Sequence, residues 1–246
     1  MCVKTPEEVA GLRAAGEIVR KMLEAMKQAV RPGITTAELD EIGASVMREH
    51  GARSAPVLVY QFPGVCCISV NDEAVHGIPG SRRIQNGDLV KLDVTVEKDG
   101  FMADAAITVP AGAVSETSHQ LTACAQLAFE KAIQIARAGI RVSEIGRTVE
   151  REVRRWDFFV IHALGGHGIG RTIHEEPSVP NYFDPDARGI LTEGLVITIE
   201  PIIAAGSGVA VLARDGWTVK TADRSNSAHF EHTLMITRNM PVLLTA

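Results

Sequence analysis

The chain has 246 residues, of which 46% are hydrophobic, and a net charge of -5. This length and composition predict a globular protein with a large core, and the acidic balance argues against a broad nucleic-acid-binding surface. No apolar run reaches the roughly 18 to 20 residues that span a bilayer, and the first residues form no apolar signal segment. We therefore expect a cytoplasmic protein that contacts no membrane.

The expected helices come in two pairs. Thr5-Pro6-Glu7-Glu8 is typical of a helix start, with proline at the first helical position, and Arg31-Pro32-Gly33 ends this helix after Val30. By the same periodicity the other helices are expected over residues 36–50, 117–136 and 143–155. Strands are expected over residues 89–97, 100–109, 195–203, 209–213, 217–221 and 230–237.

Two segments of the chain recur at nearly the same offset. Arg31-Pro32-Gly33-Ile34 recurs 106 residues later as Arg137-Ala138-Gly139-Ile140, and the segment that ends at Asp93 aligns, at an offset of 107, with the one that ends at Glu200. We interpret this as an α+β unit present twice, in halves of about 1–110 and 111–246. No linker separates them, so we expect one domain over residues 1–246. Chance recurrence of a common turn-then-strand pattern is the alternative.

The first pair of strands brings two carboxylates together. Asp99-Gly100 is a strong hairpin signal, and a turn at these residues places Thr95 opposite Asp104 and makes Asp93 a diagonal neighbour of Asp104. A turn one residue earlier would make the two aspartates direct partners. In either register they share one face, where protons or cations must offset their repulsion.

Three more polar side chains stand in unusual surroundings. Glu200 and Glu231 interrupt apolar segments, where a carboxylate has to be paired or coordinated. His167 lies in the glycine-rich segment 165–170, which we expect to form a loop that closely approaches a ligand. Four carboxylates and one imidazole suit a pair of divalent ions, because carboxylates can bridge two cations. The candidate metal ligands are Asp93, Asp104, His167, Glu200 and Glu231.

Cysteines do not add to this set. Cys2, Cys66, Cys67 and Cys124 show no CxxC spacing, whereas structural zinc sites generally have paired ligands at short spacing. We therefore expect buried or neutral thiols.

An ordered set of motifs resembles a known family. The motifs are Val70-Asn71-Asp72-Glu73-Ala74-Val75-His76-Gly77-Ile78-Pro79, Asp93 with Asp104, Gly166-His167-Gly168-Ile169-Gly170, His174-Glu175-Glu176-Pro177, Ile199-Glu200-Pro201 and Glu231-His232-Thr233. Together they span nearly the whole chain and resemble the type I methionine aminopeptidases. The resemblance implies the pita-bread fold, an α+β arrangement of two pseudo-symmetric halves with a curved antiparallel sheet flanked by helices. The compact length fits type I better than type II.

The resemblance also implies how two divalent ions would be held. One would bind Asp104, His167, Glu200 and Glu231, and the other Asp93, Asp104 and Glu231. The sequence does not decide between cobalt, manganese, iron and zinc.

Three residues acquire catalytic roles by the same resemblance. Glu200 would exchange a proton with the attacking water, His174 would contact the substrate carbonyl or oxyanion, and His76 would contact the scissile amide nitrogen.

A pocket for the methionine side chain is implied as well. Its residues here are Phe62, Cys67, His76, Ile173, His174 and Trp217. Pro56 and Val59 stand where the family often has cysteine and tyrosine, so we expect a different pocket shape. Phe62 and Trp217 would equally suit ordinary core positions.

The expected function is removal of the N-terminal methionine from nascent polypeptides whose second residue is small. We expect a monomer that contacts the ribosome transiently. One alternative is an Xaa-Pro aminopeptidase-like enzyme, which usually carries a large extra N-terminal domain. The other is a non-catalytic binding module on the same fold, in which metal ligands are typically lost, whereas all five are present here.

Overall fold

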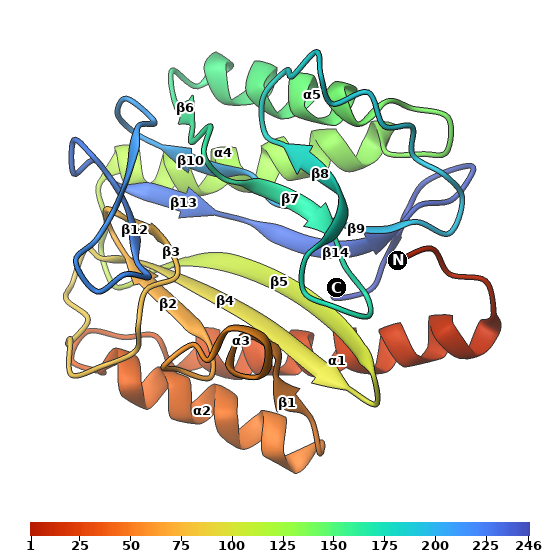
Figure 1. Cartoon of the computed structure of the whole chain (residues 1–246). Coiled ribbons are helices and arrows are strands. Elements are labelled where there is room, and N and C mark those ends of the chain that lie inside the picture. Colours follow the sequence, from red (N-terminus) through yellow and green to blue (C-terminus); the bar gives the residue numbers. More distant parts are fainter.

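Two pairs of helices flank a curved antiparallel sheet in the computed structural model, which describes all residues from 1 to 246. In Figure 1, α1 and α2 lie below the strands, and α4 and α5 lie above them. The five helices are α1 (Pro6–Ala29), α2 (Thr36–Glu49), α3 (Ala55–Tyr60), α4 (Glu116–Ile135) and α5 (Val142–Arg155). The four predicted helices are confirmed to within two residues, and α3 was not predicted. None of the five combines the length and apolar content needed to cross a bilayer.

The first helix shows why these boundaries could be predicted from the sequence. Thr5 Oγ1 accepts a hydrogen bond of 3.3 Å from the Glu8 backbone N–H, and Pro6 occupies the first helical position, where its missing N–H costs nothing. The signal is therefore local and independent of the rest of the fold.

The main sheet has the strand order β1-β4-β5-β14-β9-β7-β8, with β2 also paired to β4 and β15 to β14. Its strands are β1 (Arg53–Ser54), β2 (Cys67–Val70), β4 (Leu89–Lys98), β5 (Phe101–Pro110), β7 (Gly165–Gly168), β8 (Glu175–Pro180), β9 (Val196–Ile199), β14 (Glu231–Met235) and β15 (Val242–Leu243). Two smaller sheets have the orders β13-β10-β6 and β11-β12-β3. They comprise β3 (Glu73–Val75), β6 (Phe159–Val160), β10 (Ile202–Ala204), β11 (Ala210–Leu212), β12 (Val219–Thr221) and β13 (Ser227–His229).

The recurring segments have equivalent backbone surroundings. The Gly33 N–H donates to Ile84 O at 2.8 Å, and the Gly139 N–H donates to Leu191 O at 2.9 Å. Both glycines have positive φ angles, of 96° and 92°, which side chains rarely adopt. The sequence repeat therefore corresponds to the same turn used once in each half.

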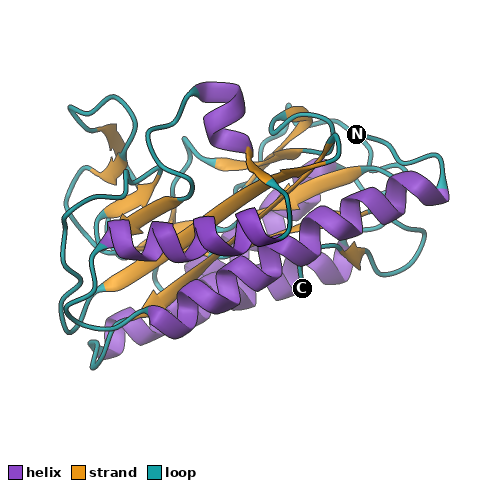
Figure 2. Cartoon of the chain, turned by 90° about the horizontal axis from the view of Figure 1, so that it is seen from below, coloured by secondary structure: helices purple, strands orange, loops and turns teal.

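Along the strands, side chains that point into the core alternate with side chains on the opposite face of the sheet. On β4, Leu92, Val94 and Val96 are fully buried in a cluster that includes residues of α1 and α2. Figure 2 shows helices lying across this side of the sheet. Because successive strand residues point to opposite faces, Asp93 and Thr95 project away from these helices. The second half packs its own cluster between α4, α5 and the strands around β9.

The hairpin register agrees with one of the two that the sequence allowed. Thr95 pairs with Asp104 and Asp93 pairs with Ala106, so the aspartates are diagonal neighbours. Asp99 and Gly100 form the turn, and both have positive φ angles, of 50° and 81°. Two successive residues with positive φ match the twist of the flanking strands.

Replacing Gly100 by alanine should therefore strain this turn. We expect Gly100→Ala to lower the free energy of unfolding by about 1 to 2 kcal/mol, because a Cβ is disfavoured at this φ angle. Urea denaturation would measure it. Gly80→Ala is the matched control, since no atom lies within 4 Å of its added Cβ and its φ angle is not in the positive region. Equal stability of the two variants would contradict the assigned turn.

Candidate active site

A cavity of about 360 Å³ gathers residues from both halves of the chain. It lies on the side of the sheet to which Asp93 and Asp104 point. All eleven site residues predicted from the sequence line it: Phe62, Cys67, His76, Asp93, Asp104, His167, Ile173, His174, Glu200, Trp217 and Glu231. The cavity is also lined by Tyr60 and His229, which the sequence analysis did not single out.

Three neighbouring strands align three of the carboxylates. Ala106 on β5 pairs with Asp93 on one side and with Glu231 of β14 on the other, so the two acids flank a small side chain. Asp104 lies two residues away on the same face of β5. Its backbone is fixed from β14, because the Asp104 N–H donates to Thr233 Oγ1 at 2.9 Å and Thr233 Oγ1 donates back to Asp104 O at 2.8 Å. Sheet register therefore determines the spacing of these three acids.

His167 lies on a strand, so the prediction of a loop for this segment is wrong. β7 fits closely between β8 and β9, and a Cβ added to Gly166 or Gly168 would come within 2.5 or 2.2 Å of a neighbouring backbone oxygen. The glycines thus permit close strand packing rather than mobility. His167 Nδ1 lies 2.9 Å from Gly168 O, which can only accept a hydrogen bond, so Nδ1 carries the proton and the Nε2 lone pair is free.

Glu200 lies where a predicted strand is interrupted. The expected strand over residues 195–203 is instead β9 and β10, which belong to different sheets. Pro201 follows Glu200 and has no N–H to donate to a ladder, which explains the break. Thr198 Oγ1 donates to Glu200 Oε1 at 2.8 Å, and His167 Nε2 lies 3.5 Å from the same oxygen. The break turns this carboxylate toward the other acids.

The electrostatics of the cluster are unfavourable without cations. Burial, followed by repulsion from neighbouring carboxylates, raises the pKa values of Asp104, Glu200 and Glu231 well above their usual range. Asp104 Oδ1 and Glu231 Oε1 are buried without a hydrogen-bond partner. Burial also lowers the pKa of His167 to about 4, which leaves its imidazole neutral. Unpaired buried oxygens beside a neutral imidazole are suitable donors for divalent cations.

The donor atoms are close enough together to bind a common ion. Those of Asp104, His167 and Glu231 lie within 4.8 Å of one another, as do those of Glu200, His229 and Glu231. Glu231 belongs to both groups, as expected of a bridging carboxylate.

Two exposed histidines stand beside the acids. His76 follows β3 with a φ angle of 58°, and His174 packs against His167 with ring centroids 4.2 Å apart. The Tyr60 hydroxyl lies 2.5 Å from His174 Nδ1. Tyr60 escaped the sequence analysis because it ends α3, a six-residue helix too short to show periodicity.

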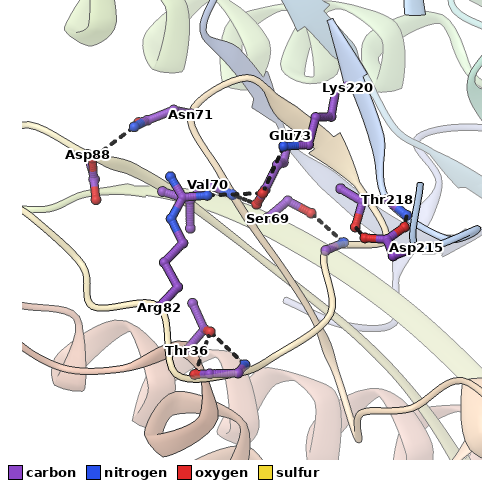
Figure 3. A network of polar contacts seen from close by, with 12 residues as sticks. Thr36, Ser69, Val70, Asn71, Glu73, Arg82, Asp88, Asp215, Thr218 and Lys220 are labelled. Atoms are coloured by element: carbon purple, nitrogen blue, oxygen red, sulfur yellow. Dashed lines mark hydrogen bonds and ion pairs between the residues drawn. The ribbon is translucent and has the colours of Figure 1, made fainter. Parts of the chain in front are cut away.

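A polar network holds the segment that carries His76 (Figure 3). Glu73 accepts from the Val70 N–H at 2.9 Å and lies 3.0 Å from an Arg82 nitrogen and 3.4 Å from Lys220 Nζ. Ser69 Oγ accepts from the Gly77 N–H at 2.9 Å. These contacts tie β2 and β3 to β12, and thereby place His76 next to the turn that contains Trp217.

The remaining wall of the cavity is apolar. Phe62 and Trp217 meet edge to face with ring centroids 5.3 Å apart, and Ile173 is buried beside them. Burial raises the pKa of the Cys67 thiol well above its usual range, so this thiol stays neutral and is a poor metal ligand. Pro56 and Tyr60 line the cavity, whereas Val59 is exposed outside it. None of the four cysteines forms a disulfide.

A carboxylate and imidazole centre beside an apolar pocket defines a metal-dependent hydrolase. Residues 10–238 match the model of metallopeptidase family M24, and the chain belongs to this family. Methionine aminopeptidase 2 of Bacillus subtilis is 47% identical over 100% of this chain and 99% of its own length.

Solved structures agree with this assignment. The methionine aminopeptidase of Thermotoga maritima superposes with a TM-score of 0.96 at 34% identity, covering 100% of this chain and 99% of that one. The architecture is the pita-bread fold that the sequence resemblance implied. The prolidase of Pyrococcus furiosus, at 24% identity and a TM-score of 0.81, shares the fold, and this chain covers 65% of its length.

Removing one predicted bridging carboxylate should abolish metal binding and at the same time stabilise the metal-free protein. We expect Asp104→Asn to abolish stoichiometric binding of divalent ions, while the metal-free variant melts higher than the metal-free wild type because a neutral amide costs less to bury and does not repel the other acids. Each kcal/mol of relief corresponds to about 2 to 4 °C in a chain of this size. Metal analysis and thermal melting would measure both effects.

The matched control is Asp99→Asn in the same hairpin, where the aspartate is exposed. It should leave metal binding unchanged. Full metal occupancy in Asp104→Asn would overturn the bridging assignment.

Metal binding should release protons. The pKa values of Asp104, Glu200 and Glu231 are raised, and a bound cation favours their ionised forms, so binding displaces protons from them and affinity increases as pH rises. His167, whose pKa is about 4, is already unprotonated above about pH 5 and contributes none. Calorimetry in two buffers of different ionisation enthalpy would count the protons. An affinity that is constant between about pH 5.5 and 7.5 would contradict this account.

Proposed function

We propose that this chain is a methionine aminopeptidase that removes the N-terminal methionine from nascent polypeptides whose second residue is small, using two divalent ions. The observation that carries the proposal is the convergence of four carboxylates and the His167 imidazole on a cavity with an apolar wall. The identity of 47% to a methionine aminopeptidase supports it. The similarity of this chain to the prolidase of Pyrococcus furiosus is weaker, at 24% identity, and concerns the fold alone.

The ligands would be divided between two ions that share two carboxylates. Asp104, His167, Glu200 and Glu231 would hold one ion, and Asp93, Asp104 and Glu231 the other. Bound there, two divalent ions would polarise the scissile carbonyl and lower the pKa of the attacking water. Their identity among cobalt, manganese, iron and zinc would depend on availability as well as on the donor atoms.

Glu200 is suited to proton transfer. A carboxylate within reach of the attacking water can accept a proton from it and return that proton to the leaving group. Thr198 Oγ1, at 2.8 Å, holds one of its oxygens in place. We assign Glu200 as the group that takes a proton from water and passes it toward the leaving amine.

The two exposed histidines would contact the peptide. His174, oriented by the Tyr60 hydroxyl at 2.5 Å, would donate to the carbonyl oxygen as negative charge develops on it. His76, on the other side of the cavity, would contact the scissile amide nitrogen. Both roles require side chains that a substrate can reach, and both histidines are exposed.

The apolar wall would receive the methionine side chain. Phe62 and Trp217, packed edge to face, would form it with Cys67 and Ile173. A thioether makes favourable contacts with aromatic rings. The methionine would therefore be held by packing while its amide lies over the acids.

The cellular setting follows from this substrate. Nascent chains emerge from ribosomes, so we infer a cytoplasmic enzyme that meets the ribosome transiently and works as a monomer. Its five metal ligands come from both halves of the repeat, Asp93 and Asp104 from residues 1–110 and the others from residues 111–246. We infer that residues 1–246 act as one catalytic domain.

Peptide assays with purified protein would test this function. We expect chelator-sensitive release of methionine from Met-Gly-X, restored by adding metal, and at least tenfold slower release from Met-Leu-X, since about 1.4 kcal/mol of clash at the second residue suffices for that factor. Preferential cleavage of X-Pro peptides would instead indicate an Xaa-Pro aminopeptidase. No cleavage of any of the three would indicate a non-catalytic protein.

A further inference from the structure

One buried histidine in the cavity has no role in the function proposed above. His229 ends β13 and is only 2% exposed. Its backbone is held on both sides by Thr108, since the His229 N–H donates to Thr108 Oγ1 at 2.8 Å and Thr108 Oγ1 donates to His229 O at 2.9 Å. Lys91 Nζ anchors the start of the same strand through Ser227 O at 3.2 Å. The ring therefore has a fixed position.

The ring points into the acidic cluster. His229 Nε2 lies 3.3 Å from Glu231 Oε2 and 3.9 Å from Glu200 Oε2. Neither of its ring nitrogens forms a hydrogen bond, although both are buried. A buried imidazole with two unsatisfied nitrogens is costly and calls for a partner that the protein atoms alone do not supply.

The separations suit coordination of a common ion. Ligand bonds of about 2.1 Å place two donor atoms roughly 3 Å apart when they are adjacent in an octahedral site and roughly 4.2 Å apart when opposite. The two contacts of His229 Nε2 fall between these limits. The donor atoms of Glu200, His229 and Glu231 all lie within 4.8 Å of one another.

Glu200 stands between two imidazoles. Its Oε1 lies 3.5 Å from His167 Nε2, and its Oε2 lies 3.9 Å from His229 Nε2. An ion on either side of this carboxylate would therefore find a nitrogen donor. The arrangement differs from the set inferred from the sequence, in which all nitrogen ligation came from His167.

We propose that His229 is a further metal ligand, which supplies a second imidazole nitrogen to the centre together with Glu200 and Glu231. The inference rests on the proposed metal-dependent function. It shifts the donor set toward nitrogen, which favours zinc, cobalt and iron over manganese, because imidazole suits the former and oxygen donors suit the latter.

Pulsed EPR on the wild-type protein loaded with Mn²⁺ provides a test that needs no variant. Nitrogen couplings from two imidazoles support the proposal, and couplings from a single imidazole overturn it. If the wild type binds no metal at all, both this proposal and the proposed function fail. If it binds metal and releases methionine but shows one imidazole, only this proposal fails.

Calorimetric titration of variants with Co²⁺ provides an independent test. We expect His229→Gln to raise the Kd for Co²⁺ at least about tenfold, with a smaller rise for Mn²⁺, and to change the visible absorption of bound Co²⁺. Loss of a histidine that merely oriented the carboxylates could also raise Kd, but it would leave the donor atoms and hence the absorption spectrum of bound Co²⁺ unchanged, and an unchanged spectrum would overturn the proposal. His167→Gln serves as the positive control, and His162→Gln, an exposed histidine stacked on Tyr182, as the negative one.

Discussion

Repulsion among buried carboxylates is the constraint on which the rest of this structure depends. Two unit charges about 4 Å apart repel by about 4 kcal/mol at the effective dielectric of a protein, and a whole domain is stable by only about 5 to 15 kcal/mol. Asp104, Glu200 and Glu231 nonetheless share one cavity with Asp93. The hydrophobic clusters beneath the sheet, with α1 and α2 on one side and α4 and α5 on the other, hold them there. Cations that bind to this cluster relieve the repulsion and stabilise the fold in the same event.

The candidate ligands are positioned by hydrogen bonds from neighbouring residues. Thr233 fixes the backbone of Asp104, Thr198 fixes the carboxylate of Glu200, and the Gly168 carbonyl selects the tautomer of His167. These groups limit how far the donor atoms can move apart when they repel one another. His229, with its backbone held by Thr108 and its ring unpaired, has the same rigidity, which is why we include it among the ligands.

The metal centre and the substrate side of the cavity are built differently. The candidate ligands come from both halves, four of them on strands and Glu200 directly after β9, and the turns at Gly33 and Gly139 are equivalent in the two halves. The apolar wall and the exposed histidines come instead from the end of α3 and the residues after it, from the segments around His76 and His174, and from the turn that carries Trp217. Substrate preference can therefore change through these segments while the metal ligands keep their geometry.

Local signals in the sequence determined the four long helices, the Asp99-Gly100 hairpin and hence the shared face of Asp93 and Asp104, because caps, turns and strand alternation depend on neighbouring residues. They also identified five candidate ligands by their chemistry. Only the tertiary structure decided that His167 lies on a strand, since its glycines are recognised as a packing device only beside β8 and β9. The break at Pro201, the contact of Tyr60 with His174 and the position of His229 were likewise undetermined, because each depends on contacts between residues distant in the chain. Residue type and spacing can nominate a ligand, but the direction of its lone pair is set by the fold.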